Sequence, residues 1–179
     1  MLLETRHLDD GSNVRSFMVD EVEFDLAGSD LYFGSLLNDR GRAEWPSALE
    51  EAVRHYDADW LADRFADRSL WVDSYVQQRK TGPVTMPVSR DAHTRLAIGE
   101  FGRFYIRGVC RAAVEAGSGT VRVTRLKASA QPRPESQLLI GTEVAADALL
   151  LDLRGNKGRD TYNGVPGGPN SGLGVELMD

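Results

Sequence analysis

The sequence is short of the residue types that build covalent or metal-stabilised structures. Its 179 residues contain a single cysteine, Cys110, so no intrachain disulfide is possible. The three histidines, His7, His55 and His93, lie far apart, and the chain has no Cys-x-x-Cys or His-x-x-x-His pair. This spacing is not that of a typical structural zinc site. We therefore assign neither a metal nor a cofactor.

Long apolar runs are also lacking. No segment approaches the ~20 apolar residues that a membrane helix requires. The first seven residues, MLLETRH, lack the cationic start and apolar core of a signal peptide. A single cysteine is compatible with a reducing compartment. The sequence thus predicts a cytoplasmic protein that does not bind membranes.

The common catalytic motifs are missing as well. There is no Gly-x-Ser-x-Gly elbow, and the glycine-rich segments 155–161 and 164–174 lack the spacing of a phosphate-binding loop. The chain therefore has no catalytic signature. An enzyme would need a site assembled from scattered residues, such as Tyr105, Arg125 and Glu135.

Charge is present in quantity but is unevenly distributed. Residues 1–80 hold 9 basic and 17 acidic residues, whereas residues 90–133 hold 9 basic and 3 acidic ones. The net charges of the two segments are therefore −8 and +6, within a chain of net charge −6. Such a separation is resolved inside the fold, between copies of the chain, or by an anionic partner.

The hydrophobic pattern predicts a single α+β domain over residues 1–179, with a glycine-rich tail at 155–179. Residues 1–30 alternate apolar and acidic side chains around an Asp-Gly turn, which favours an N-terminal β-hairpin. We expect this hairpin to form a small antiparallel sheet with a strand at 120–127 and a C-terminal strand at 173–177. Helices are expected to pack on the sheet, at residues 45–56, 57–80, 90–116 and 142–154.

The helix at 90–116 is expected to be central, because most of its circumference is apolar. Arg103, Arg107 and Arg111 form a row at i, i+4 and i+8 on the remaining polar strip, and we call them the arginine row. Three further positions of this helix are glycines: Gly99, Gly102 and Gly108. Each glycine costs about 1 kcal/mol relative to alanine in a helix. We therefore expect neighbouring elements to pass close to them, and protein carboxylates to face the arginines.

Arg133 is a further candidate for binding, because prolines on both sides hold its backbone in an extended form. We assign Arg103, Arg107, Arg111 and Arg133 to partner binding. The function predicted from these features is a non-catalytic interaction or assembly subunit, such as a component of a larger particle encoded by a phage or mobile element. Its partner would be another protein or a second copy. The alternative is a nucleic-acid-binding protein or nuclease that uses the basic 90–133 region.

Overall fold

The structure is a computed structural model that describes residues 3–128, 131–157, 161, 164–165 and 172–178. Within these residues the helices are α1 (Val14–Ala27), α2 (Asp39–His55), α3 (Ala58–Arg64), a 3-10 turn η1 (Arg68–Leu70), α4 (Ala92–Glu115), α5 (Pro134–Leu139) and α6 (Ala146–Gly155). The strands are β1 (Ser74–Arg79), β2 (Gly82–Pro87), β3 (Thr120–Arg125), β4 (Glu143–Ala145) and β5 (Leu173–Glu176).

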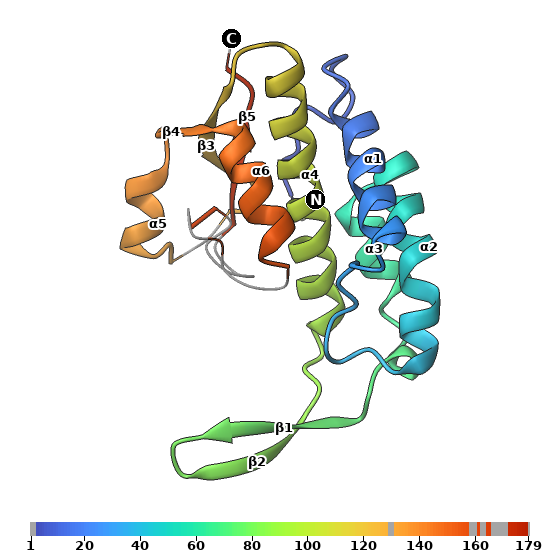
Figure 1. The fold of residues 1–179 in the computed structure, drawn as a ribbon. Helices are drawn as coiled ribbons and strands as arrows, with labels where there is room; N and C mark the ends of the chain where they lie inside the picture. Colours follow the sequence, from blue (N-terminus) through green and yellow to red (C-terminus); the bar gives the residue numbers. More distant parts are fainter. Residues whose placement is uncertain (1–2, 129–130, 158–160, 162–163, 166–171, 179) are drawn as a thin grey trace.

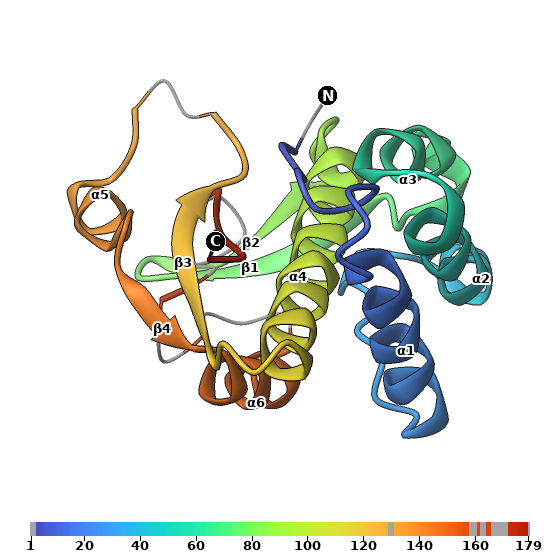
Figure 2. The same ribbon diagram turned by 90° about the horizontal axis from the view of Figure 1, so that it is seen from above.

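Helix α4 runs through the middle of the molecule. Helices α1, α2 and α3 lie on one side of it, and α6 and the three-stranded sheet lie on the other (Figure 1). Figure 2 shows the same two groups from above, with α4 between them. Sixteen of the 24 residues of α4 are buried, as expected for a helix whose polar strip is narrow. The predicted α+β class and the central helix are confirmed.

The sheet is antiparallel, with β3 between β4 and β5. Val121 faces Val144 of β4, and Val123 faces Val175 of β5. Both valines of β3 are buried, because every second residue of the strand points into the core. The predicted strand at 120–127 and the predicted C-terminal strand are confirmed. Those parts of the glycine-rich tail at 158–160, 162–163, 166–171 and 179 lie outside the described residues.

The prediction of an N-terminal β-hairpin is wrong, because residues 14–27 form helix α1. Val14, Met18 and Val22 are spaced at i, i+4 and i+8 and are fully buried on one stripe of the helix. Glu21 and Asp25 are buried too, although the alternating pattern placed them in solvent. Arginines from α4 meet these two carboxylates, and this tertiary pairing is invisible in a local pattern of polar and apolar residues.

The prediction of one helix over residues 57–80 is wrong as well. Helix α3 ends at Arg64, and Asp67 then accepts a hydrogen bond from the Ser69 N–H and starts the turn η1. The indole N–H of Trp71 donates to the Phe65 carbonyl over 2.9 Å, and this buried hydrogen bond holds the segment that follows α3 against the core. Residues 74–79 continue as strand β1 and pair with β2.

The three glycines of α4 differ in what they approach. A Cβ at Gly108 would lie 2.7 Å from both the Met18 side chain and the Val14 carbonyl, so α1 packs directly on the bare backbone. At Gly102 the nearest atom, from Leu3, would lie at an ordinary 3.5 Å. A Cβ at Gly99 would meet no atom within 4 Å. The prediction that a neighbouring element packs closely is confirmed at Gly108. It is wrong at Gly99, which borders open space.

Candidate functional site

Arg107 is the middle residue of the arginine row, and carboxylates of α1 enclose it. Its Nε donates to Oε2 of Glu21 over 2.8 Å, and its two terminal nitrogens donate to both oxygens of Asp25 over 2.7 and 3.0 Å. The side chain is fully buried and its guanidinium lies over the ring of Phe104. The contact with Asp25 uses the planar fork of arginine, which a lysine does not reproduce.

Glu21 of α1 accepts hydrogen bonds from arginines of two other helices, α4 and α6. Arg154 of α6 donates to its two oxygens over 2.9 and 2.5 Å, and Arg111 of α4 donates over 3.1 Å. Burial alone would raise the pKa of Glu21, but the hydrogen bond from Arg154 and the charge of Arg107 outweigh it and lower the pKa to about 2. Glu21 is therefore ionised at neutral pH and joins α1, α4 and α6.

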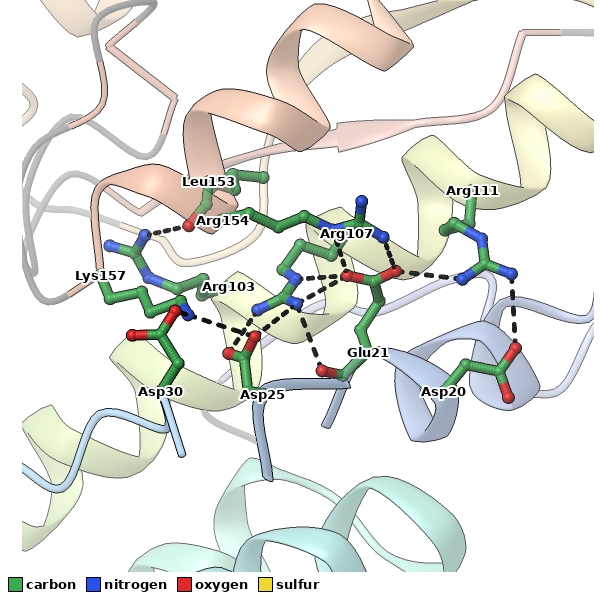
Figure 3. Close-up of polar contacts among 10 residues, drawn as sticks. All are labelled: Asp20, Glu21, Asp25, Asp30, Arg103, Arg107, Arg111, Leu153, Arg154 and Lys157. Carbon is green, nitrogen blue, oxygen red and sulfur yellow. Dashed lines mark hydrogen bonds and ion pairs between the residues drawn. The ribbon is translucent and has the colours of Figure 1, made fainter. Parts of the chain in front are cut away.

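Further ion pairs extend from this centre (Figure 3). The ammonium of Lys157 lies 3.3 Å from Asp25 and also contacts Asp30. Arg111 reaches Asp20 over 3.4 Å. Four cations thus face four carboxylates, and we call these eight side chains the charge cluster: Asp20, Glu21, Asp25, Asp30, Arg107, Arg111, Arg154 and Lys157.

Arg103 continues the row toward the end of α6. Its Nη1 donates to the backbone carbonyl of Leu153 over 3.2 Å (Figure 3). The same nitrogen donates to the backbone carbonyl of Asn156 over 2.8 Å. Carbonyl groups at the end of a helix carry partial negative charge, so a cation is favourable there. Arg103 is 4% exposed. It therefore fastens the end of α6 to α4 from inside the molecule.

These contacts identify the anion that faces the arginine row. Carboxylates of the same chain face Arg107 and Arg111, as the sequence predicted. Arg107 is enclosed by its own chain, and the side chain of Arg111 is 33% exposed. Two of the nine basic residues of segment 90–133, Arg107 and Arg111, thus pair with carboxylates of residues 1–80. The assignment of the row to a partner surface stays a prediction.

Arg133 does not join the row. It is exposed and immediately precedes α5, where its carbonyl accepts a hydrogen bond from the Gln137 N–H over 3.2 Å. Helix α5 lies beyond the sheet, on the side of the molecule away from α1 (Figure 1). Any role of Arg133 in binding is therefore separate from that of the charge cluster, and it also stays a prediction.

The residues considered for a scattered catalytic site have different surroundings. Tyr105 is buried in α4, and its hydroxyl accepts a hydrogen bond from the His7 N–H over 3.3 Å. Glu135 is exposed on α5, and Arg125 ends β3. Burial raises the pKa of the Cys110 thiol to about 12, which makes it a poor nucleophile. The described part of the chain contains no cluster of His, Cys, Asp and Glu suited to a metal ion.

The hairpin β1–β2, residues 74–87, was not predicted from the sequence. We call it the arm, because it extends away from the helical body (Figure 1). None of its residues is buried, and Val76 and Val84 are 61% and 36% exposed. Two prolines within seven residues excluded a helix there, and Tyr75 and Val76 have high β-propensity. Those were the signals from which a hairpin was predictable.

The two outer edges of the arm differ in hydrogen-bonding capacity. In an antiparallel hairpin with a two-residue turn, residues alternate between positions that bond across the ladder and positions that point outward. The register places Pro83 and Pro87 at outward positions of β2, so that edge lacks two donors. The outer edge of β1 presents the N–H groups of Ser74, Val76 and Gln78. No described residue outside the arm hydrogen-bonds to these three groups.

Comparison with protein-family models, with curated proteins and with solved structures finds no match to this chain. The functional interpretation therefore depends on the geometry of the fold. None of the described helices combines the length and the apolar character needed to cross a membrane.

Proposed function

We propose that the protein is a non-catalytic interaction and assembly subunit that acts in the cytoplasm and associates with a second copy through the arm. The observation that carries the proposal is the open outer edge of β1. Unpaired N–H and C=O groups along a strand are a template for strand addition. A two-stranded hairpin is also only marginally stable in water by itself, so a third strand would stabilise it.

The charge of the arm supports an acidic partner. Its two charged residues, Arg79 and Lys80, are both basic, whereas the whole chain has a net charge of −6. A second copy of the chain therefore offers the complementary charge. Val76 and Val84 add apolar contact area beside the strand edge. Electrostatic attraction of this kind weakens as ionic strength rises.

The two edges of the arm provide a matched pair of variants. Val76→Pro removes an outward donor from β1, and Thr85→Pro removes the outward donor directly opposite on β2. Both place a proline at the same level of the hairpin, so their effects on the arm itself are comparable. Only Val76→Pro is expected to abolish association, because the partner strand pairs with β1.

Sedimentation velocity over a concentration series, at low and high ionic strength, tests the proposal. The expected result is a discrete oligomer that weakens with salt, persists in Thr85→Pro and is lost in Val76→Pro. A monomer at every concentration and ionic strength contradicts association between copies. Equal loss in both variants contradicts strand addition at β1.

Nucleic-acid binding by the basic 90–133 region is the second candidate function, and exposed cations such as Arg90, Arg122 and Arg133 support it. It has less support because Arg107 and Arg111 already pair with carboxylates of the chain. Binding to a labelled duplex and a labelled single strand tests it, with Arg133→Glu as the variant. Loss of binding in this variant would favour this function, and no binding by the parent chain would contradict it.

A further inference from the structure

A cavity of about 320 Å³ lies between α4 and the segments that flank the arm. Its volume falls within the roughly 300–1,000 Å³ that is usual for sites of small molecules. Gly99 of α4 forms part of its wall without a side chain, and this explains the open space beside that residue. Large apolar side chains dominate the remaining wall: Leu36, Trp71, Leu96, Ile98, Ile106 and Leu126.

Glu100 is the acidic residue on this wall. It is 5% exposed, and its carboxylate forms no hydrogen bond or ion pair with any residue that the structure describes. Such burial is costly, because the carboxylate has lost its hydration and no hydrogen-bond donor replaces the water; the nearby charge of Arg103 offsets the cost only in part. The Glu100 carboxylate therefore lacks a hydrogen-bond donor, and the cavity provides space for a small molecule that carries such a donor.

The cationic groups of the wall, by contrast, already have partners. Arg103 donates to the carbonyls of Leu153 and Asn156, and Arg95 pairs with Asp91 over 2.6 Å. An anionic ligand would have to compete for these arginines. A ligand with a hydrogen-bond donor would instead satisfy Glu100 directly, and a positively charged donor forms the stronger bond to a carboxylate.

We propose that this cavity binds a small, mainly apolar molecule that carries one protonated amine, and that the amine donates to the carboxylate of Glu100. The apolar part of the ligand lies against Leu96, Ile106 and Trp71. The site is separate from the outer edge of β1, although Tyr75 at the base of the arm also lines the cavity.

Three probes with a shared phenyl body and different head groups test the proposal: 2-phenylethylamine, 2-phenylethanol and 3-phenylpropanoate. Titration of the isotope-labelled full chain, followed by NMR, measures each dissociation constant and locates the perturbed amides. We expect the amine to bind at least about tenfold more tightly than the alcohol, with the largest shifts at residues 96–103. Glu100→Gln is expected to remove this preference and to leave the affinity for the alcohol within about threefold.

Two variants at Gly99 separate binding in the cavity from binding elsewhere. Gly99→Leu fills the open space and is expected to abolish binding of the amine and the alcohol. Gly99→Ala, which adds one methyl group at the same position, is expected to preserve both. The proposal is overturned if the amine has no advantage over the alcohol, if 3-phenylpropanoate binds more tightly, if Gly99→Leu binds like the parent chain, or if none of the probes binds.

Discussion

Glu21 and Glu100 are both buried against α4, and their surroundings are opposite. Glu21 receives hydrogen bonds from Arg107, Arg111 and Arg154, which hold its pKa at about 2. Glu100 has no such donor among the described residues, and burial raises its pKa to about 7 although the charge of Arg103 partly offsets the effect. Both are glutamates with almost no exposed surface, so the partners of each carboxylate decide its ionisation.

The two glutamates mark a difference between the two halves of α4. The C-terminal half, with Arg107 and Gly108, is closed against α1 by ion pairs and by direct backbone contact. The N-terminal half, with Gly99 and Glu100, borders a cavity and retains an unpaired polar group. We interpret the first half as structural and the second as open to a ligand.

The strongest test of the closed half is Arg107→Met, which leaves Asp25 without its bidentate partner. Removal of one member of a buried ion pair typically costs about 3–5 kcal/mol. We expect a loss of this size in the free energy of unfolding, measured by urea denaturation. Arg111→Met is the control, because a side chain that is 33% exposed contributes about 1 kcal/mol or less. Similar losses in both variants would show that Arg107 has no special place in the cluster.

A methyl group added to each half of α4 sharpens the comparison. Gly108→Ala would place its Cβ 2.7 Å from the Val14 carbonyl, so α1 must shift, and we expect a loss of about 1–3 kcal/mol. Gly99→Ala meets no neighbour and is expected to gain about 0.5–1 kcal/mol through helix propensity. Thermal unfolding of the two variants measures the difference. The same sign of change in both would contradict the contrast between a closed and an open half.

Glu100→Gln probes the open half through the pH dependence of stability. Because its pKa rises from 4.5 to about 7 on folding, the folded chain holds a proton that the unfolded chain releases between these values. The contribution of Glu100 to the free energy of unfolding is therefore fully present below about pH 4.5, and it is lost as the pH rises through about 7. We expect Glu100→Gln to be more stable than the parent chain by about 3 kcal/mol at pH 8 and equal to it near pH 4. Urea denaturation across this pH range measures both differences, and an unchanged pH dependence would contradict a raised pKa.

The sequence predicted the parts of the fold whose periodic pattern is local and strong. The long apolar helix, the strand at 120–127 and the C-terminal strand belong to this group. It also predicted that protein carboxylates face the arginines, because Arg107 has no acidic residue three or four positions away in its own helix; this is confirmed for Arg107 and Arg111 and is wrong for Arg103, whose guanidinium bonds to backbone carbonyls. The pattern failed at Glu21 and Asp25, since a buried charge resembles a surface charge until its partner is known.

The arm and the cavity could not be predicted from local sequence patterns, because both depend on tertiary contacts. Residues 57–80 contain apolar positions at helical spacing, but the hydrogen bond from Trp71 to Phe65 and the pairing with β2 are tertiary contacts. The cavity depends on the approach of segments far apart in the chain, from Leu36 to Leu126. No spacing in the sequence indicates that Glu100 borders an open volume whereas Arg103, three residues later, is held by α6.

Direct titration of the side-chain carboxyls by carbon-13 NMR, with Glu21→Gln and Glu100→Gln to assign the signals, is the most direct test of the contrast between the two glutamates. We expect the Glu21 carboxyl to titrate near pH 2 and the Glu100 carboxyl near pH 7. The addition of 2-phenylethylamine should lower the pKa of Glu100 and leave that of Glu21 unchanged. Titration of both carboxyls near their ordinary value of 4.5 would contradict the contrast on which the two halves of α4 are distinguished.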